Sequence, residues 1–174
     1  MTQKHCFPPV VDANTRVLVL GSLPGEVSLA QSQYYAHKQN RFWHLMGEVI
    51  GQDLAGIDYE ARLQMLLLHR VGLWDVVAQA QRQGSLDSNI RNHASNDLIA
   101  LAESLPQLVA IAFNGATAAR LGMRALQDAA GLYQFISLPS SSAAHTKSYA
   151  EKLHAWEALR AWLVETNAQR TTKD

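Results

Sequence analysis

Cysteine is nearly absent from this sequence: the 174 residues include one, Cys6, which we expect to be an inert thiol. One thiol cannot build a disulfide framework, an iron–sulfur cluster or a zinc site of several thiolates. Long apolar runs are missing as well, since every apolar stretch is far shorter than the roughly 20 residues of a membrane-spanning helix. The first nine residues contain Lys4 and His5 and no apolar run, so we expect no signal peptide. These absences predict a cytoplasmic protein with no membrane contact, and we expect a monomer.

An excess of positive charge is also missing, because 15 basic residues are balanced by 15 acidic ones. Formal neutrality argues against an extended nucleic-acid-binding surface. The acidic residues are unevenly spread, however: none lies within residues 27–47 or 129–150, whereas Arg41 and Lys147 do. This distribution leaves room for a local anion-binding face.

Short apolar runs alternate along the chain with segments of helical periodicity. The runs are typical of buried strands and cover residues 16–21, 72–77, 108–113 and 132–138. The helical segments cover residues 42–50, 59–69, 96–105 and 116–125, and a last helix begins near Ser148 with a capping-box pattern. The alternation predicts an α/β fold, a three-layer α/β/α sandwich with a central four-stranded, mostly parallel sheet. We expect a single domain over residues 1–165 and a frayed tail over 166–174.

In a parallel sheet, ligands bind at the carboxyl ends of the strands. The loops of interest therefore begin at Gly21, Asp75, Asn114 and Pro139. The first of them contains a stiff turn, Gly21-Ser-Leu-Pro-Gly25, in which glycines on both sides of a proline let the backbone approach a ligand closely. Such a turn by itself is equally consistent with a structural role.

The continuation of this loop, Tyr35-Ala-His-Lys-Gln-Asn40-Arg-Phe-Trp43, resembles the first motif of the mismatch-specific uracil-DNA glycosylases. Two further segments, 72–77 with 84–90 and 138–143, are similar to the hypoxanthine-DNA glycosylase branch of the uracil-DNA glycosylase superfamily. The resemblance covers residues 17–159. It implies a DNA glycosylase of base excision repair that flips a deaminated base out of DNA, without a metal or cofactor.

The departures from the wider superfamily concern the attacking water. Uracil-specific members carry Asp or Asn where this chain has Leu23, and their second motif commonly begins with His or Asn where this chain has Leu138. The resemblance to the hypoxanthine branch instead assigns catalysis to Asn40. An amide does not act as a general base, but its oxygen can orient a water toward the anomeric carbon. Asn40 is also placed to form a turn or a cap just before the helix that begins at Phe42, and this structural role is compatible with the catalytic one.

The resemblance further implies the residues that hold the flipped base. Tyr35 aligns with the aromatic residue that stacks on the base, although a loop tyrosine can also close the core. Asp75 takes the place of a base-reading asparagine; as a carboxylate it would accept the ring N–H of hypoxanthine or uracil, whereas adenine has no such N–H. A solvated loop carboxylate or a helix cap is the structural alternative for Asp75. Ser22 and Leu23 are assigned to the same base pocket.

Backbone contacts to DNA are assigned to a second group of residues. Ser140, Ser141 and Ser142 offer hydroxyls and amides of the kind that bind phosphates. Gly25, Lys147 and Arg41 are assigned to the phosphates as well. In relatives this serine loop also inserts a side chain into the gap left by the base; here the candidates are Ala143, Ala144 and His145.

Two other classes of protein stay open at this point. The serine loop with His145 invites a serine-hydrolase interpretation, but a Gly-x-Ser-x-Gly motif is absent and no acidic residue follows the histidine recognisably. A non-catalytic module that binds damaged DNA or a nucleotide is the second alternative, favoured by Leu23 and Leu138. No Walker or Gly-x-Gly-x-x-Gly segment supports a triphosphate or dinucleotide site.

Overall fold

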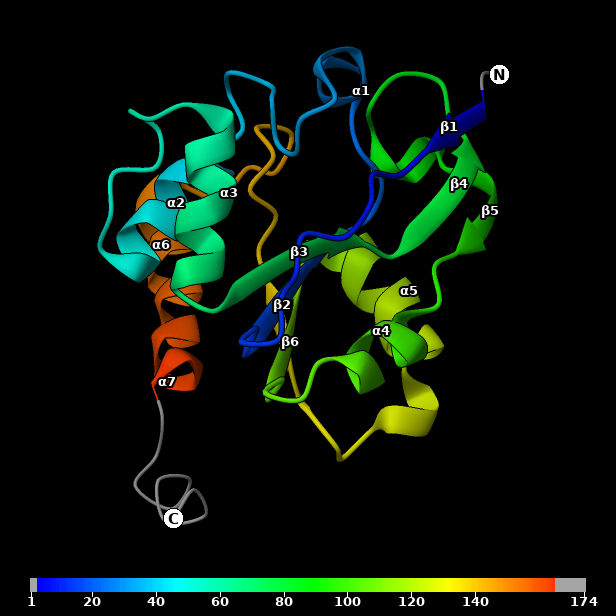
Figure 1. Cartoon of the computed structure of the whole chain (residues 1–174). Helices are drawn as coiled ribbons and strands as arrows, with labels where there is room; N and C mark the ends of the chain where they lie inside the picture. Colours follow the sequence, from blue (N-terminus) through cyan, green and yellow to red (C-terminus); the bar gives the residue numbers. More distant parts are fainter. Residues whose placement is uncertain (1–2, 165–174) are drawn as a thin grey trace.

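The computed structural model describes residues 3–164, so the expected tail over 166–174 lies outside the described residues. Its centre is a four-stranded sheet (Figure 1). The strands are β2 (Val17–Gly21), β3 (Val71–Asp75), β6 (Ala110–Asn114) and β7 (Gln134–Leu138), in the order β3-β2-β6-β7. Every neighbouring pair of this sheet is parallel. The predicted four-stranded parallel sheet is confirmed.

Side chains of β2 alternate between two separate hydrophobic cores, because successive strand residues point to opposite faces of a sheet. Val17 and Val19 pack into one core, while Leu18 and Leu20 pack into the other. The first core is covered by α2 (Phe42–Ile50), α3 (Tyr59–Leu68), α6 (Tyr149–Trp156) and its continuation through Glu157–Leu159 to α7 (Arg160–Leu163). The second core is covered by α4 (Leu98–Ser104) and α5 (Ala116–Ala125). The helices therefore form the two outer layers (Figure 1).

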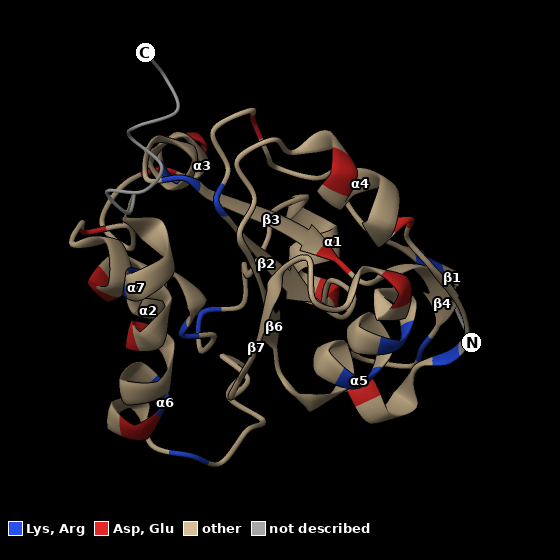
Figure 2. Cartoon of the chain, turned by 90° about the horizontal axis from the view of Figure 1, so that it is seen from below, with Lys and Arg blue, Asp and Glu red and all other residues tan. Residues whose placement is uncertain are grey.

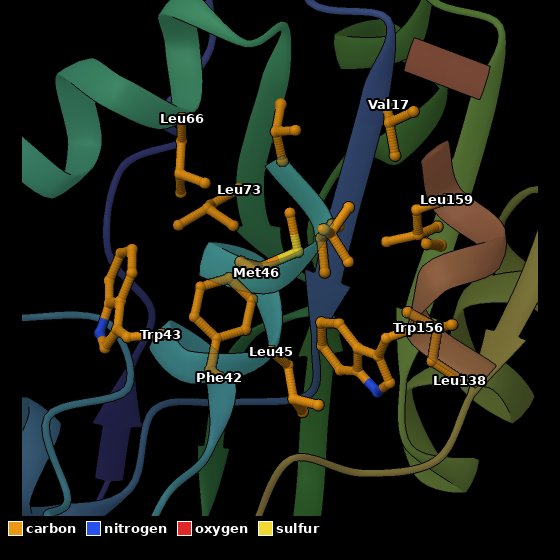
Figure 3. Close-up of a cluster of buried hydrophobic side chains, with 14 of the residues drawn as sticks. Val17, Phe42, Trp43, Leu45, Met46, Leu66, Leu73, Leu138, Trp156 and Leu159 are labelled. Carbon is orange, nitrogen blue, oxygen red and sulfur yellow. The ribbon is translucent and has the colours of Figure 1, made fainter. Parts of the chain in front are cut away.

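The first core has an aromatic centre (Figure 3). Phe42 and Trp43 of α2 meet edge to face, with ring centroids 4.9 Å apart, and Phe42 meets Trp156 of α6 at 5.8 Å. All three rings are buried, and the expected inward positions Leu45 and Met46 are fully buried with them. This packing holds the start of α2 rigidly against the sheet, which matters because the motif loop runs directly into that helix.

A second sheet was not predicted. It joins β1 (Gln3–His5), β4 (Val77–Gln81) and β5 (Arg91–Ser95) as antiparallel strands in the order β1-β4-β5. The expected strand over 72–77 thus ends at Asp75, and residues 78–81, for which no element was expected, belong to β4. The cause is pairing between distant segments, since the polar sequence of β4 carries little strand signal of its own.

Smaller differences concern helix ends. The long loop after β2 contains a short helix, α1 (Glu26–Gln31), and 3-10 turns occupy Asp87–Asn89 and Gln127–Ala129. Helix α4 begins two residues later than expected because the Asp97 side chain accepts from the amide of Ala100. The capping at α6 is confirmed, since the Ser148 hydroxyl accepts from the amide of Glu151.

Within residues 3–164, no helix has the length and apolarity needed to span a bilayer.

Candidate active site

A cavity of about 560 Å³ opens at the carboxyl ends of the parallel strands. The last residues of β2, β3 and β6, namely Gly21, Asp75 and Asn114, line it, together with residues of the loops that follow β2, β4 and β7. Most residues assigned to the site from the sequence line this one cavity: Ser22, Leu23, Gly25, Tyr35, Asn40, Asp75, Ser140, Ser141 and Ser142.

Asp75 is buried at the end of β3, with 3% of its surface exposed. It is therefore neither the solvated loop carboxylate nor the helix cap that the sequence left open. Its Oδ2 atom is buried and has no hydrogen-bond partner among the described residues. Burial, together with the nearby charge of Asp87, raises the pKa of the Asp75 carboxyl to about 7, and Arg82 partly opposes this rise. The Asp75 carboxyl therefore titrates near neutral pH. The interpretation from the sequence took it to be fully ionised.

Tyr35 uses one face of its ring to pack against Phe42, with centroids 3.9 Å apart and planes 18° from parallel. Only the opposite face and the hydroxyl can then meet a ligand. The hydroxyl is buried and makes no close hydrogen bond among the described residues, although the Asn114 side chain lies beside it. Burial, followed by the charge of Asp75, raises the pKa of Tyr35, and Asn114 lowers it less than these raise it, so the phenol stays protonated and can donate. Its backbone adopts φ 55°, a left-handed conformation uncommon for a tyrosine and often found at functional sites.

Gly21 brings Tyr35 and Asp75 together. A Cβ atom at this position would lie 2.6 Å from Asp75 Oδ1 and 2.9 Å from the Tyr35 hydroxyl oxygen, so only glycine leaves both groups in place. A hydrogen-bond acceptor and a donor, both without partners, thus border the same side of the cavity. Leaving such buried polar groups unsatisfied costs free energy, and a polar ligand would remove that cost.

Asn40 lines the cavity just before α2. Its Oδ1 accepts a hydrogen bond from the amide of Phe42 at 2.9 Å, two residues on, so Asn40 forms a turn before the helix. It is not the N-cap of α2, because that position is Arg41, which makes no side-chain capping bond. A carbonyl oxygen has two lone pairs, and the second can hold a water. Asn40 and Tyr35 therefore share one cavity, as their assignment to a common site requires.

Ser22, Leu23 and Gly25 form one wall of the cavity. The hydroxyl of Ser22 donates to Oδ1 of Asp87 at 2.6 Å, which links this turn to the loop after β4. Leu23 is buried and packs into the second core, and Gly25 precedes α1 as its N-cap.

The serine loop forms the opposite wall, and its polar atoms are largely engaged in local hydrogen bonds. The amide and hydroxyl oxygen of Ser141 both pair with the Asn114 side chain at 2.9 Å. The hydroxyl of Ser140 accepts from the amide of Ser142, whose own hydroxyl accepts from the amide of Ala144. Ser140 and Ser142 are only partly buried and face the cavity, whereas Ser141 is buried and anchors the loop.

Two of the assigned cations lie outside the cavity lining. Arg41 is exposed, with its guanidinium carbon 5.8 Å from the ring centre of Tyr149, and Lys147 is exposed on the loop before α6. In the view of Figure 2, Lys and Arg positions are interspersed with Asp and Glu positions along the ribbon. Both residues thus stand beside the site, where a DNA backbone could pass, and not within it.

Three histidines have distinct settings. His145 lines the cavity, and burial together with Lys152 and Lys147 lowers its pKa, which favours a neutral ring. His37 also lines the cavity, and its Nδ1 accepts from the amide of Gln39. His44 lies on α2 and borders a separate hollow. Within residues 3–164, no group of three or more His, Cys, Asp and Glu residues is arranged to hold a metal ion.

Sequence reasoning missed Asn114, Asp87 and Arg82 as parts of this site. Asn114 had been noticed only as the break after a strand, and Asp87 lay within a motif whose residues were given no roles. Arg82 carried no motif signal. The hint in the sequence was the high density of polar residues after Asp75. In the folded chain, several of these residues are connected by hydrogen bonds.

The fold and site define the class first: a doubly wound α/β protein with a polar cavity at the carboxyl ends of its parallel strands. The chain belongs to the uracil DNA glycosylase superfamily, whose family model matches residues 8–160. This confirms the resemblance inferred from the motifs.

Individual relatives agree with this membership. The chain is 40% identical over 154 residues to a hypoxanthine DNA glycosylase of Methanosarcina barkeri, covering 88% of this chain and 96% of the relative. It is 41% identical over 156 residues to a hypoxanthine DNA glycosylase of Methanosarcina acetivorans, covering 90% and 97%. A solution NMR structure from M. acetivorans, provisionally described as a uracil DNA glycosylase, superposes with a TM-score of 0.83 at 40% identity, covering 93% of this chain and 99% of that one.

Proposed function

We propose that this protein is a monofunctional DNA glycosylase that extrudes hypoxanthine from DNA, hydrolyses its glycosidic bond and leaves an abasic site. The observation that carries the proposal is that Asn40, Tyr35 and Asp75 line one cavity in a chain of this superfamily. Family membership and the named relatives support a DNA glycosylase that acts on deaminated bases. The choice of hypoxanthine over uracil or xanthine is the finer part of the proposal.

The chemistry needs a positioned water and a site that tolerates an anionic leaving group. The oxygen of the water forms a bond to C1′ as the bond between C1′ and N9 breaks, and the electron pair of that bond leaves with the purine. The water's proton passes to solvent or to the departing base. Asn40, whose oxygen has a lone pair left beside its bond to Phe42, would orient the water and favour the positive charge that develops on the sugar.

Recognition of the base would use the unpartnered pair of Asp75 and Tyr35. Hypoxanthine presents a ring N–H beside its six-position carbonyl. An ionised Asp75 would accept that N–H, and the Tyr35 hydroxyl would donate to the carbonyl. Adenine places a ring acceptor opposite the carboxylate, so this arrangement disfavours the undamaged base. The free face of Tyr35 would stack on the base, which is worth roughly 1–3 kcal/mol.

Binding of the DNA backbone is assigned to the rim of the cavity. Ser140, Ser142 and Gly25 would approach phosphates beside the extruded nucleotide, with Arg41 and Lys147 adding positive charge from outside. Because the chain is neutral overall, we expect few phosphate contacts and a correspondingly shallow salt dependence. We expect a monomer that works in the cytoplasm; both remain predictions.

The two alternatives make different predictions about the serine loop and about turnover. A serine hydrolase needs a hydroxyl bonded to a basic side chain, but the oxygens of Ser140, Ser141 and Ser142 accept from backbone amides or Asn114. A binding module would hold inosine-containing DNA without releasing its base.

An excision panel tests the proposal. Duplexes and single strands with one deoxyinosine, deoxyuridine or deoxyxanthosine are incubated with excess protein at stated salt concentration, and released base and abasic sites are measured together. We expect release of hypoxanthine to be fastest. Tight binding without release from any of these substrates supports the binding module and contradicts the proposal.

A further inference from the structure

Arg82 follows β4 and is buried, with 1% of its surface exposed. Its Nε donates to the carbonyl of Gly84 at 2.9 Å, Nη1 donates to the carbonyl of Leu23 at 3.4 Å, and Nη2 donates to that of Pro24. Leu23 and Pro24 belong to the turn that walls the cavity, whereas Gly84 belongs to the loop after β4. One guanidinium therefore ties two separate loops together.

The same group reaches the cavity through Asp87. Nη1 of Arg82 lies 4.0 Å from Oδ1 of Asp87, the oxygen that accepts from the Ser22 hydroxyl at 2.6 Å. Ser22 and Asp87 both line the cavity, while Arg82 stands behind them. Arg82 therefore affects the shape of the cavity through these residues, although it does not line the cavity itself.

A buried cation is costly unless its contacts are well placed. Burial lowers the pKa of Arg82, while Asp87, Glu26 and Asp75 raise it. A guanidinium stays charged under these conditions and offers a planar set of donors that suits three carbonyls at once. A lysine could keep the charge but could not reproduce this fork.

We propose that Arg82 is the positioning residue of the base pocket: it fixes the Leu23–Pro24 turn against the loop that carries Asp87, and it supplies positive charge near Asp75. This proposal rests on the proposed function, because it concerns how the pocket reads a base. Arg82 acts through Asp87 and the turn, so it is not itself a catalytic residue.

The effect of the Arg82 charge on Asp75 can be separated from the effect of Arg82 on the position of the Leu23–Pro24 turn. The groups coupled to the Asp75 carboxyl come from several elements of the fold: Cys6, Tyr34, Tyr35, Arg82 and Asp87. Arg82 is the cation of this set, and it lowers the pKa of Asp75. Removing its charge should therefore raise the pKa of Asp75, so that a higher pH is needed to ionise the carboxyl.

The experiment compares Arg82→Met, Arg82→Lys and wild type, with Arg91→Met as the matched control. Arg91 lies on β5 and also donates to backbone carbonyls, but it is exposed and does not line the cavity. For Arg82→Met we expect kcat to fall by about 100-fold, because small misplacements of catalytic groups have effects of this size. We also expect the acid limb of the pH profile of kcat/KM to lie about one pH unit higher. For Arg82→Lys we expect about a tenfold lower kcat with the limb unmoved. Arg91→Met should match wild type.

A ¹³C NMR titration of the Asp75 carboxyl, followed in the same variants, reports on the charge effect without catalysis. A midpoint for Asp75 that is equal in wild type and Arg82→Met, or wild-type kcat in Arg82→Lys, overturns the proposal. If circular dichroism shows that Arg82→Met does not fold, the outcome rests on kcat of Arg82→Lys. Failure of wild-type protein to release any base contradicts the proposed function instead, and the titration then still decides whether Arg82 acts on Asp75.

Discussion

The carboxyl of Asp75 and the hydroxyl of Tyr35 both approach the bare Cα of Gly21, the first from the end of β3 and the second from the loop before α2. Both carry a buried atom without a hydrogen-bond partner among the described residues. Nδ1 of His145, which lines the same cavity, is likewise buried without a partner among these residues. Most buried polar groups in folded proteins are paired, so these three groups in one cavity indicate a place that a ligand completes. The following predictions depend on Asp75, Tyr35 and Asn40.

Asp75→Asn should stabilise the protein at pH 8 and leave its stability near pH 4 almost unchanged. Burial raises the pKa of Asp75 from 3.8 to about 7, so between these pH values the folded protein holds a proton that the unfolded chain has lost. The stability contributed by Asp75 is therefore full below about pH 4 and falls as pH rises through 7. We expect Tm to rise by about 5 °C at pH 8, measured by calorimetry across the pH range. Equal changes at both pH values would show that ionisation of Asp75 is not involved.

Tyr35→Phe should separate the hydroxyl from the ring. The ring can keep its contact with Phe42, while an unpaired buried hydroxyl is removed, so stability should rise by about 1 kcal/mol. Excision of hypoxanthine should fall about tenfold, because a hydrogen bond to the six-position carbonyl is lost. Single-turnover kinetics and chemical denaturation measure the two effects. Wild-type kinetics in this variant would remove the hydroxyl from base recognition.

Tyr35→Ala tests stacking. Relative to wild type, the variant should lose about 1–3 kcal/mol more binding free energy on deoxyinosine duplex than on undamaged duplex. The reason is that only a flipped base stacks on the ring. Fluorescence anisotropy at fixed salt gives both affinities. Equal losses on the two duplexes would contradict a stacking role.

Asn40→Ala should retain DNA binding but lose most base release, by about 100-fold or more. It should also lose about 1 kcal/mol of stability, since its oxygen accepts from the amide of Phe42 at the start of α2. Asn40→Ser is the matched variant, because a serine hydroxyl can accept the same bond in a turn and restores part of that stability without restoring the amide. Single-turnover excision at full rate in either variant would remove Asn40 from catalysis.

Borohydride should trap no covalent adduct between the protein and deoxyinosine DNA. None of the residues that line the cavity is a lysine, and the nearby Lys152 donates its Nζ to the carbonyl of Ser142 at 3.0 Å. Water is therefore the expected nucleophile, and the product should be an unprocessed abasic site. A trapped adduct that disappears in Lys152→Met would instead identify a lyase activity.

Much of this fold was predictable because local patterns carry it. The run from Arg16 to Gly21 is apolar and β-branched, and it is buried on both faces as a central parallel strand must be. The helical periodicity over residues 42–50 predicted α2, and the side chains of Phe42, Leu45, Met46 and Val49 are buried. The strand β4 was not predicted because its sequence Ala-Gln-Ala-Gln resembles a polar loop. It forms a strand by pairing with β1, near the N-terminus, and with β5.

The sequence by itself determined which residues are candidates for the site, because the resemblance of its motifs assigned Asn40 and Tyr35 in one loop and Asp75 at the end of a strand. Their chemical states were decided only by the tertiary structure. Removal from water raises the pKa of Asp75 to about 7, and contacts between distant loops bring Arg82 against the Leu23–Pro24 turn. Desolvation and through-space charge depend on which segments meet in the folded chain, and no local pattern of residues encodes that meeting.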